Sequence, residues 1–115
     1  MINLRENSER TEPGALTEAV YYILLSLLAP RHGYAVMQNV ERLTDGRVTL
    51  GAGTLYGALN TLLEKAWIMS LAGERDSRKK EYGITELGKS VLQRELRRLE
   101  ELVAHGKDEL EGLEQ

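Results

Sequence analysis

The chain of 115 residues contains no cysteine and no phenylalanine, and it has only one tryptophan and two histidines. Without cysteine there can be no disulfide framework, no Cys-based zinc site and no thiol nucleophile. Two histidines are too few for a His-rich metal centre. The acidic residues are scattered and lack a nucleophile or base partner, so no catalytic constellation is found. We therefore expect a protein that is not an enzyme and that uses no cofactor and no metal.

Long apolar runs are also missing. The longest one, Ala19–Ala29, has eleven residues, whereas a membrane span needs about 18. The first ten residues lack the apolar segment of a secretory signal. We therefore expect no membrane partner and a cytoplasmic location, which the absence of cysteine also fits.

The composition is that of a globular protein, with 42% hydrophobic and 29% charged residues. Apolar residues at helical spacing predict three helices: one that begins after the capping residue Thr17 and ends before Pro30, one that runs from Gly33 to Asp45, and one that follows Gly53. Their expected inward rows are Leu16, Val20, Ile23, Leu24, Leu27 and Leu28, then Tyr34, Met37, Val40 and Leu43, then Leu55, Leu59, Leu62 and Leu63.

Extended segments are expected between and after these helices. Val48–Leu50 is predicted to be a short strand. Trp67–Gly73 and Lys79–Ile84 flank a polar turn, which predicts a hairpin. Thr85 then caps a long helix with a narrow apolar seam at heptad spacing, formed by Leu92, Leu96, Leu99, Val103, Leu110 and Leu113.

This order of elements predicts the fold class: mainly α with a small β-hairpin, a winged helix-turn-helix with a long C-terminal helix. We divide the chain into a polar N-terminal arm (1–15), a winged helix-turn-helix DNA-binding domain (16–85) and a C-terminal dimerisation helix (86–115). In this fold the third helix enters the major groove of double-stranded DNA and the hairpin, or wing, lies on the adjacent backbone.

The distribution of charge supports that division. The net charge is −3 overall, but it is −2 over residues 1–30, +2 over 31–85 and −3 over 86–115. Four cations gather on the predicted hairpin, where a wing would meet phosphates: Arg75, Arg78, Lys79 and Lys80. The alternative is a solvated turn whose charges protect an edge strand.

Two motifs resemble the PadR-like family of transcriptional regulators. One is Gly53-Thr-Leu-Tyr56, and the other, about thirty residues later, is Tyr82-Gly-Ile-Thr-Glu-Leu-Gly88. His32-Gly33-Tyr34 matches the start of the family's second helix. The resemblance implies a dimeric winged-helix repressor whose recognition helix begins near Gly53 and whose C-terminal helix mediates dimerisation.

The chain departs from the family at two adjacent positions. Ala66 stands where the family usually has glycine at the end of the third helix, which indicates either a different exit or a cost of about 1 kcal/mol. Trp67 replaces an aliphatic residue, and we interpret it as a core residue rather than a ligand platform. Some relatives bind flat apolar drugs with aromatic residues on the C-terminal helix; this helix has none, so the resemblance does not imply drug binding. An unidentified small-molecule inducer stays open as a partner.

The face of the third helix opposite its leucines contains the candidate base-reading residues. Thr54, Asn60 and Thr61 have short hydrogen-bonding side chains that can reach base edges. Tyr56 has either a phosphate-binding hydroxyl or a purely structural ring. Gly57 costs about 0.5–1 kcal/mol in a helix interior, and we attribute it to close approach of the helix backbone to DNA. An ordinary polar helix face is the alternative.

Two other groups of side chains have simpler interpretations. Adjacent Tyr21 and Tyr22 cannot both face the core, so one of them is expected to point outward. Glu101, His105 and Glu109 share one helix face, which we interpret as a solvated charged face rather than a metal site.

We predict a sequence-specific, DNA-binding dimeric repressor that reads a near-palindromic operator. The seam is too narrow for one subunit to bury, and a homodimer covers it through Leu92, Leu96, Leu99, Val103 and Leu110. The competing hypothesis is a winged-helix protein-interaction module that does not bind DNA. Such a module would not need four cations on its wing.

Overall fold

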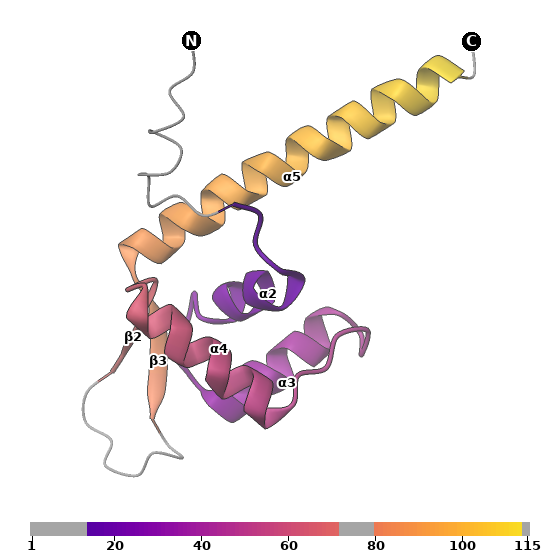
Figure 1. Ribbon diagram of the computed structural model, residues 1–115. Coiled ribbons are helices and arrows are strands. Elements are labelled where there is room, and N and C mark those ends of the chain that lie inside the picture. The colour runs from indigo at the N-terminus through magenta and orange to yellow at the C-terminus, as the bar shows by residue number, and fades with distance from the viewer. Residues whose placement is uncertain (1–13, 72–79, 114–115) are drawn as a thin grey trace.

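The computed structural model describes residues 14–71 and 80–113, and it places four helices around a small sheet (Figure 1). The predicted fold class is confirmed. In chain order the elements are α2 (Glu18–Ser26), β1 (Arg31–His32), α3 (Gly33–Leu43), α4 (Ala52–Glu64), β2 (Ile68–Ser70), β3 (Glu81–Ile84) and α5 (Glu86–Leu113). None of the described helices is both long enough and apolar enough to cross a membrane.

Helix α2 begins as the sequence predicts and ends earlier. The backbone N–H of Val20 donates to the Thr17 hydroxyl over 3.1 Å, so Thr17 is the N-cap. The helix ends at Ser26, four residues before Pro30. Leu28 therefore lies outside the helical row, and its side chain is exposed rather than inward as expected.

The inward face of α3 differs from the prediction. Val36 and Val40 are fully buried, whereas Tyr34 and Leu43 are exposed. The reason is that Gly33 faces α4, where the ring of Tyr56 lies against it. Consecutive residues are turned by about 100° around a helix, so Tyr34 points away from that contact.

The third strand of the sheet is not the predicted one. Residues 48–50 form no strand, and Arg31–His32 pairs instead with β3. The sheet is antiparallel with the order β1-β3-β2, and the register places Arg31 opposite Tyr82 and Ile68 opposite Ile84. Because β2 occupies one edge of β3, the short strand before α3 takes the other edge.

The core is one aliphatic cluster between α2, α3, α4, the sheet and the first turns of α5. Leu92 is only 7% exposed and belongs to this cluster, so its assignment to the dimer seam is corrected: within one subunit it already packs on the core. Trp67 is buried there too, as predicted. Tyr21 and Tyr22 are both half-buried against the core, so neither points fully outward as one of them was expected to. Their rings pack edge-to-face with centroids 5.8 Å apart.

The exit of α4 explains the family's preference for glycine. Ala66 has φ = 62°, the left-handed conformation that alanine adopts at a cost of about 1–2 kcal/mol. The chain therefore leaves α4 in the left-handed conformation that glycine favours, and the backbone at Ala66 is strained. Thr85 stabilises it, because its hydroxyl donates to the Ala66 carbonyl over 2.7 Å and accepts the N–H of Gly88 over 3.0 Å. One side chain thus joins the end of α4 to the start of α5.

A buried carboxylate joins the segment before α2 to α5. Glu95 is 5% exposed; Arg98 donates to both of its oxygens and the N–H of Leu16 donates to one of them over 3.3 Å. The Arg98 hydrogen bond holds the pKa of Glu95 below its usual 4.5, against the opposing effect of burial, and the Leu16 N–H lowers it further. A lowered pKa stabilises the fold above about pH 4.5, and this contribution is lost as the pH falls through the folded-state value.

We expect Glu95→Gln to destabilise the fold by about 1 kcal/mol at neutral pH, because Arg98 and Leu16 lose a charged acceptor. The difference from the parent should shrink as the pH falls below about 4.5, where Glu95 of the unfolded parent becomes protonated, and it should vanish below the lower pKa that Glu95 has in the folded state. Urea unfolding at several pH values measures this, with Glu100→Gln on the exposed part of α5 as the control. A penalty that does not change with pH would contradict the assignment.

Candidate nucleic-acid interface

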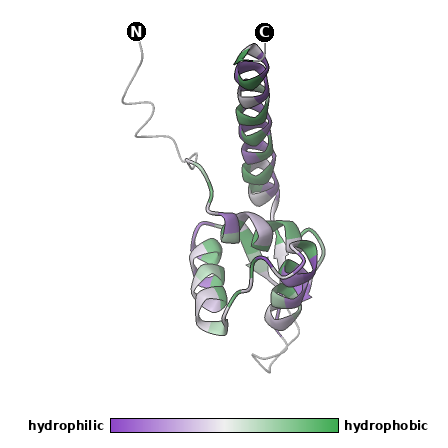
Figure 2. Ribbon diagram, turned by 90° about the vertical axis from the view of Figure 1, so that its right-hand side faces the viewer, coloured by the Kyte–Doolittle hydropathy of each residue, from purple (hydrophilic) through white to green (hydrophobic). Residues whose placement is uncertain are grey.

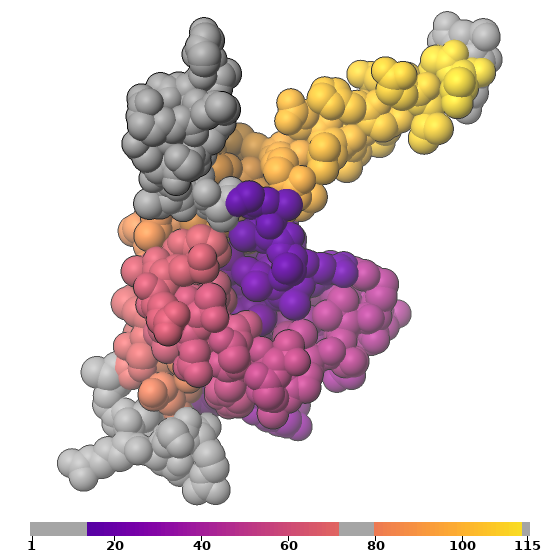
Figure 3. All heavy atoms as spheres, in the orientation of Figure 1, coloured from indigo at the N-terminus to yellow at the C-terminus, as the bar shows by residue number. Residues whose placement is uncertain are grey.

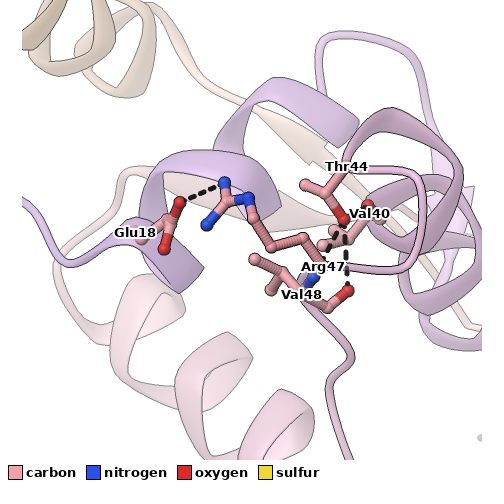
Figure 4. Close-up of polar contacts among 5 residues, drawn as sticks. All are labelled: Glu18, Val40, Thr44, Arg47 and Val48. Carbon is pink, nitrogen blue, oxygen red and sulfur yellow. Dashed lines mark hydrogen bonds and ion pairs between the residues drawn. The ribbon is translucent and has the colours of Figure 1, made fainter.

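The turn between α3 and α4 is held by hydrogen bonds. The Thr44 hydroxyl donates to the Val40 carbonyl over 2.9 Å and accepts the N–H of Val48 over 3.0 Å (Figure 4). Asp45 and Gly46 have positive φ angles of 55° and 80°, which reverse the chain at the end of α3. These interactions fix the direction in which the chain enters α4.

An ion pair joins this turn to α2. Arg47 donates to Glu18, the first residue of α2 (Figure 4). The hydrogen bond from Arg47 lowers the pKa of Glu18, and the carboxylate in turn raises the pKa of Arg47. Both side chains are more than half exposed, so the pair orients the turn more than it stabilises the fold.

Helix α4 has one buried face and one solvent face, as predicted. Leu55, Leu59 and Leu62 are at most 2% exposed. Between Ala52 and Leu63 the helix has no charged residue. The solvent face contains all five residues for which DNA contact is predicted: Thr54, Tyr56, Gly57, Asn60 and Thr61. This face combines short hydrogen-bonding groups with little bulk, which suits contact with base edges.

Tyr56 has a structural role that the sequence left open. A Cβ at Gly33 would lie 2.3 Å from the Tyr56 hydroxyl oxygen, so any other residue there would force the Tyr56 ring to move. Burial, and Tyr56 close by, raise the pKa of Tyr82 on β3. Tyr56 therefore packs between α3 and the sheet while 37% of it is still exposed. This contact explains the glycine of the His32-Gly33-Tyr34 motif.

Gly57 lies in open space. Among the described residues no atom comes within 4 Å of the position that a Cβ at Gly57 would take. The fold therefore does not require glycine there. A side chain at this position would project from the solvent face of α4.

The wing is described only in part. Strands β2 and β3 form its base, and Lys80 is half-buried next to β3. Arg75, Arg78 and Lys79 lie outside the described residues.

The distal half of α5 presents the predicted seam to solvent. Every residue from 100 to 113 is exposed, and Leu96, Val103 and Leu110 are 47–65% exposed. Figure 2 shows green apolar bands between purple hydrophilic ones along this helix. In the described part of the chain no group of three or more His, Cys, Asp or Glu residues could hold a metal ion.

The sequence model of the family described as "Transcriptional regulator PadR-like family" matches residues 23–94. The chain belongs to this family. The match runs from the last turn of α2 to the first third of α5, and so includes the solvent face of α4 and both strands of the wing. No curated protein matches the chain by sequence.

Solved structures of other transcriptional regulators have the same fold. A PadR family regulator from Eggerthella lenta is 28% identical with a TM-score of 0.60, covering 79% of each chain. RosR from H. salinarum is 25% identical with a TM-score of 0.57, over 81% of this chain and 94% of that one. A transcriptional regulator from Clostridium thermocellum is 23% identical with a TM-score of 0.66, over 79% and 90%, and shows the fold alone.

Sequence reasoning missed a polar network between α2 and α3. Asn39 is 7% exposed; its amide donates to the Ser26 hydroxyl over 2.9 Å and its oxygen accepts from Arg42. Arg31 donates to the Ser26 carbonyl over 2.7 Å. The signal in the sequence was the position of Asn39, a polar residue three positions after Val36 and therefore on the same face of the helix. The network fixes α3 against α2. It also uses Arg31 and Arg42, two of the cations of the positively charged segment 31–85, as hydrogen-bond donors within the fold.

Proposed function

We propose that this PadR-like regulator binds double-stranded DNA as a homodimer and represses transcription from a near-palindromic operator. The observation that carries the proposal is the solvent face of α4, the helix that follows the turn of the helix-turn-helix. Between Ala52 and Leu63 it carries no charge, and it combines hydrogen-bonding side chains with open space at Gly57. The wing adds cations for the flanking phosphates.

Selection of bound duplexes from a random pool, at fixed salt, tests this function. A two-fold dimer reads two half-sites, so we expect an inverted repeat whose half-site centres are about 10 base pairs apart or a multiple of that. Repression is measured by transcription from a promoter that contains the selected site. A chain that binds no duplex even at low salt would be a protein-interaction module instead.

The wing is proposed to increase the affinity for DNA of any sequence, without contributing to sequence specificity. Replacing Arg78 and Lys79 by alanine should weaken operator and random DNA alike, since phosphates carry no sequence information. The slope of log affinity against log salt should fall by about 1 for each phosphate that a side chain no longer neutralises. Fluorescence anisotropy over a salt series measures this. A weakening confined to the operator, with an unchanged slope, would contradict this role.

The seam of α5 is proposed to hold the dimer. Replacing Leu99 and Val103 together by glutamate should raise the dissociation constant of the dimer at least tenfold, because four carboxylates would be placed in one apolar interface. Val103 is 54% exposed within the subunit, so the fold should tolerate its change. Sedimentation measures the dimer, and Glu101→Gln on the charged face is the control. A parent protein that is monomeric at micromolar concentration would refute the proposed dimer.

A further inference from the structure

The chain leaves α4 through one strained residue. Helix α4 ends at Glu64, and Lys65 keeps helical angles of φ = −81° and ψ = −4°. Ala66 then turns the chain with φ = 62°, and this lets the N–H of Trp67 donate to the Leu62 carbonyl over 3.1 Å. Alanine disfavours this conformation, because its Cβ crowds the following carbonyl oxygen. Neighbouring groups must therefore hold Ala66 in it.

The next residue, Trp67, is fixed to the start of α5. Its carbonyl accepts the backbone N–H of Thr85 over 3.0 Å, and a Cβ at Gly88 would lie 2.1 Å from the same carbonyl oxygen. In Figures 1 and 3 the end of α4 lies next to the orange start of α5. Because Trp67 is held by α5 and Lys65 still continues the turn of α4, Ala66 is the joint between the two helices.

One side chain holds this joint. The Thr85 hydroxyl donates to the Ala66 carbonyl over 2.7 Å and accepts the N–H of Gly88 over 3.0 Å. The hydroxyl is thus oriented by the first turn of α5. A relaxation of Ala66 to negative φ would swing its carbonyl away from Thr85, so the hydrogen bond opposes that relaxation.

We propose that Thr85 is a positioning residue that sets the half-site spacing the protein reads. It does so by holding Ala66 left-handed, which fixes the direction of α4 relative to α5. This inference rests on the proposed function, in which α4 contacts DNA and α5 joins the two subunits. Apolar contacts of α4 with the core are non-directional, and the hydrogen-bonded joint adds a directional constraint.

Two α4 helices held in one orientation fit half-sites at one separation. An added base pair moves one half-site by about 3.4 Å along the duplex and turns it by about 34°. Spacing selectivity is therefore the quantity to measure: the ratio of the affinities for the selected operator and for the same operator with one base pair added between its half-sites. We expect a ratio of at least about ten for the parent.

Thr85→Val removes the hydroxyl and should lower this ratio to about three or less. The relaxed joint lets α4 follow the altered spacing, while the selected operator loses a pre-organised partner. Affinity for random duplex should not change, because contacts to phosphates are retained. Fluorescence anisotropy with the three duplexes measures these affinities. A Thr85→Val variant with the parent's ratio would overturn the proposal.

A merely structural role is separated by two controls. Thr17→Val removes the equivalent cap of α2, which accepts the N–H of Val20. It should lower Tm by about 5 °C, as Thr85→Val does, and keep the parent's ratio, because a loss of folded protein weakens all duplexes equally. Thr85→Ser retains the hydroxyl and should also keep the parent's ratio. A lowered ratio in the Thr17→Val variant would show that general destabilisation is the cause.

A second substitution tests the part played by Ala66. Adding Ala66→Gly to Thr85→Val should restore the parent's ratio, because glycine adopts positive φ without the strain that Thr85 opposes. A double variant as unselective as Thr85→Val would refute the role of the joint.

Failure of this inference is distinguishable from failure of the proposed function. A parent that sediments as a monomer, or that selects no inverted repeat, refutes the proposed function and the inference with it. A dimer that selects an inverted repeat, and whose spacing selectivity is the same with Thr85→Val, refutes only the role of Thr85.

Discussion

Replacing Gly88 by alanine is expected to destabilise the fold by about 2–3 kcal/mol. A Cβ at this position would lie 2.1 Å from the carbonyl oxygen of Trp67 and 2.7 Å from the side chain of Ile84. The nearest obstacle is backbone, so no rotamer change relieves it. To accept the methyl group, the first turn of α5 would have to move off β2 and β3, and the Thr85 cap would be strained.

Thermal unfolding at fixed protein concentration measures this effect, which should lower Tm by about 10–20 °C. Gly57→Ala is the matched control: it is also a helix glycine, but among the described residues no atom lies within 4 Å of its Cβ position. That variant should be more stable than the parent by up to about 1 kcal/mol. Equal stability of the Gly88→Ala variant and the parent would show that α5 does not dock this closely.

The sequence predicted the helices and the hairpin because their signals are local. Leucine spacing in α4 gave the buried row Leu55, Leu59 and Leu62 directly. The Thr17 and Thr85 caps were also readable, since a cap needs only the residues of its own turn.

The features that were missed depend on contacts between distant segments. Strand β1 is two residues long and exists because β3 offers a free edge, which no local pattern encodes. The rotation of α3 follows from the contact of Gly33 with Tyr56, 23 positions along the chain. Leu92 fits the heptad row, but the proximal part of α5 lies on the core, so the row begins to face solvent only at Leu96.

The structure explains why two of the motif positions, 33 and 88, are occupied by glycine. Gly88 is required by close packing against a backbone carbonyl, and at Gly33 a Cβ would displace the ring of Tyr56. Gly57 has no such reason within the fold. An interior helix glycine without a packing role is unfavourable by about 0.5–1 kcal/mol relative to alanine, which is why we relate it to the DNA instead.

Replacing Gly57 by leucine is expected to leave the fold and the dimer intact and to weaken operator binding at least tenfold, about 1.4 kcal/mol. The added side chain would project from the solvent face of α4 into the space that the bases occupy when this helix lies in the major groove. Fluorescence anisotropy with the selected operator measures the change in affinity, after thermal unfolding and sedimentation have verified the protein. Gly112→Leu is the matched control, because Gly112 is a helix glycine in open space on the distal part of α5. Undiminished affinity in the Gly57→Leu variant would mean that this face of α4 does not lie against DNA.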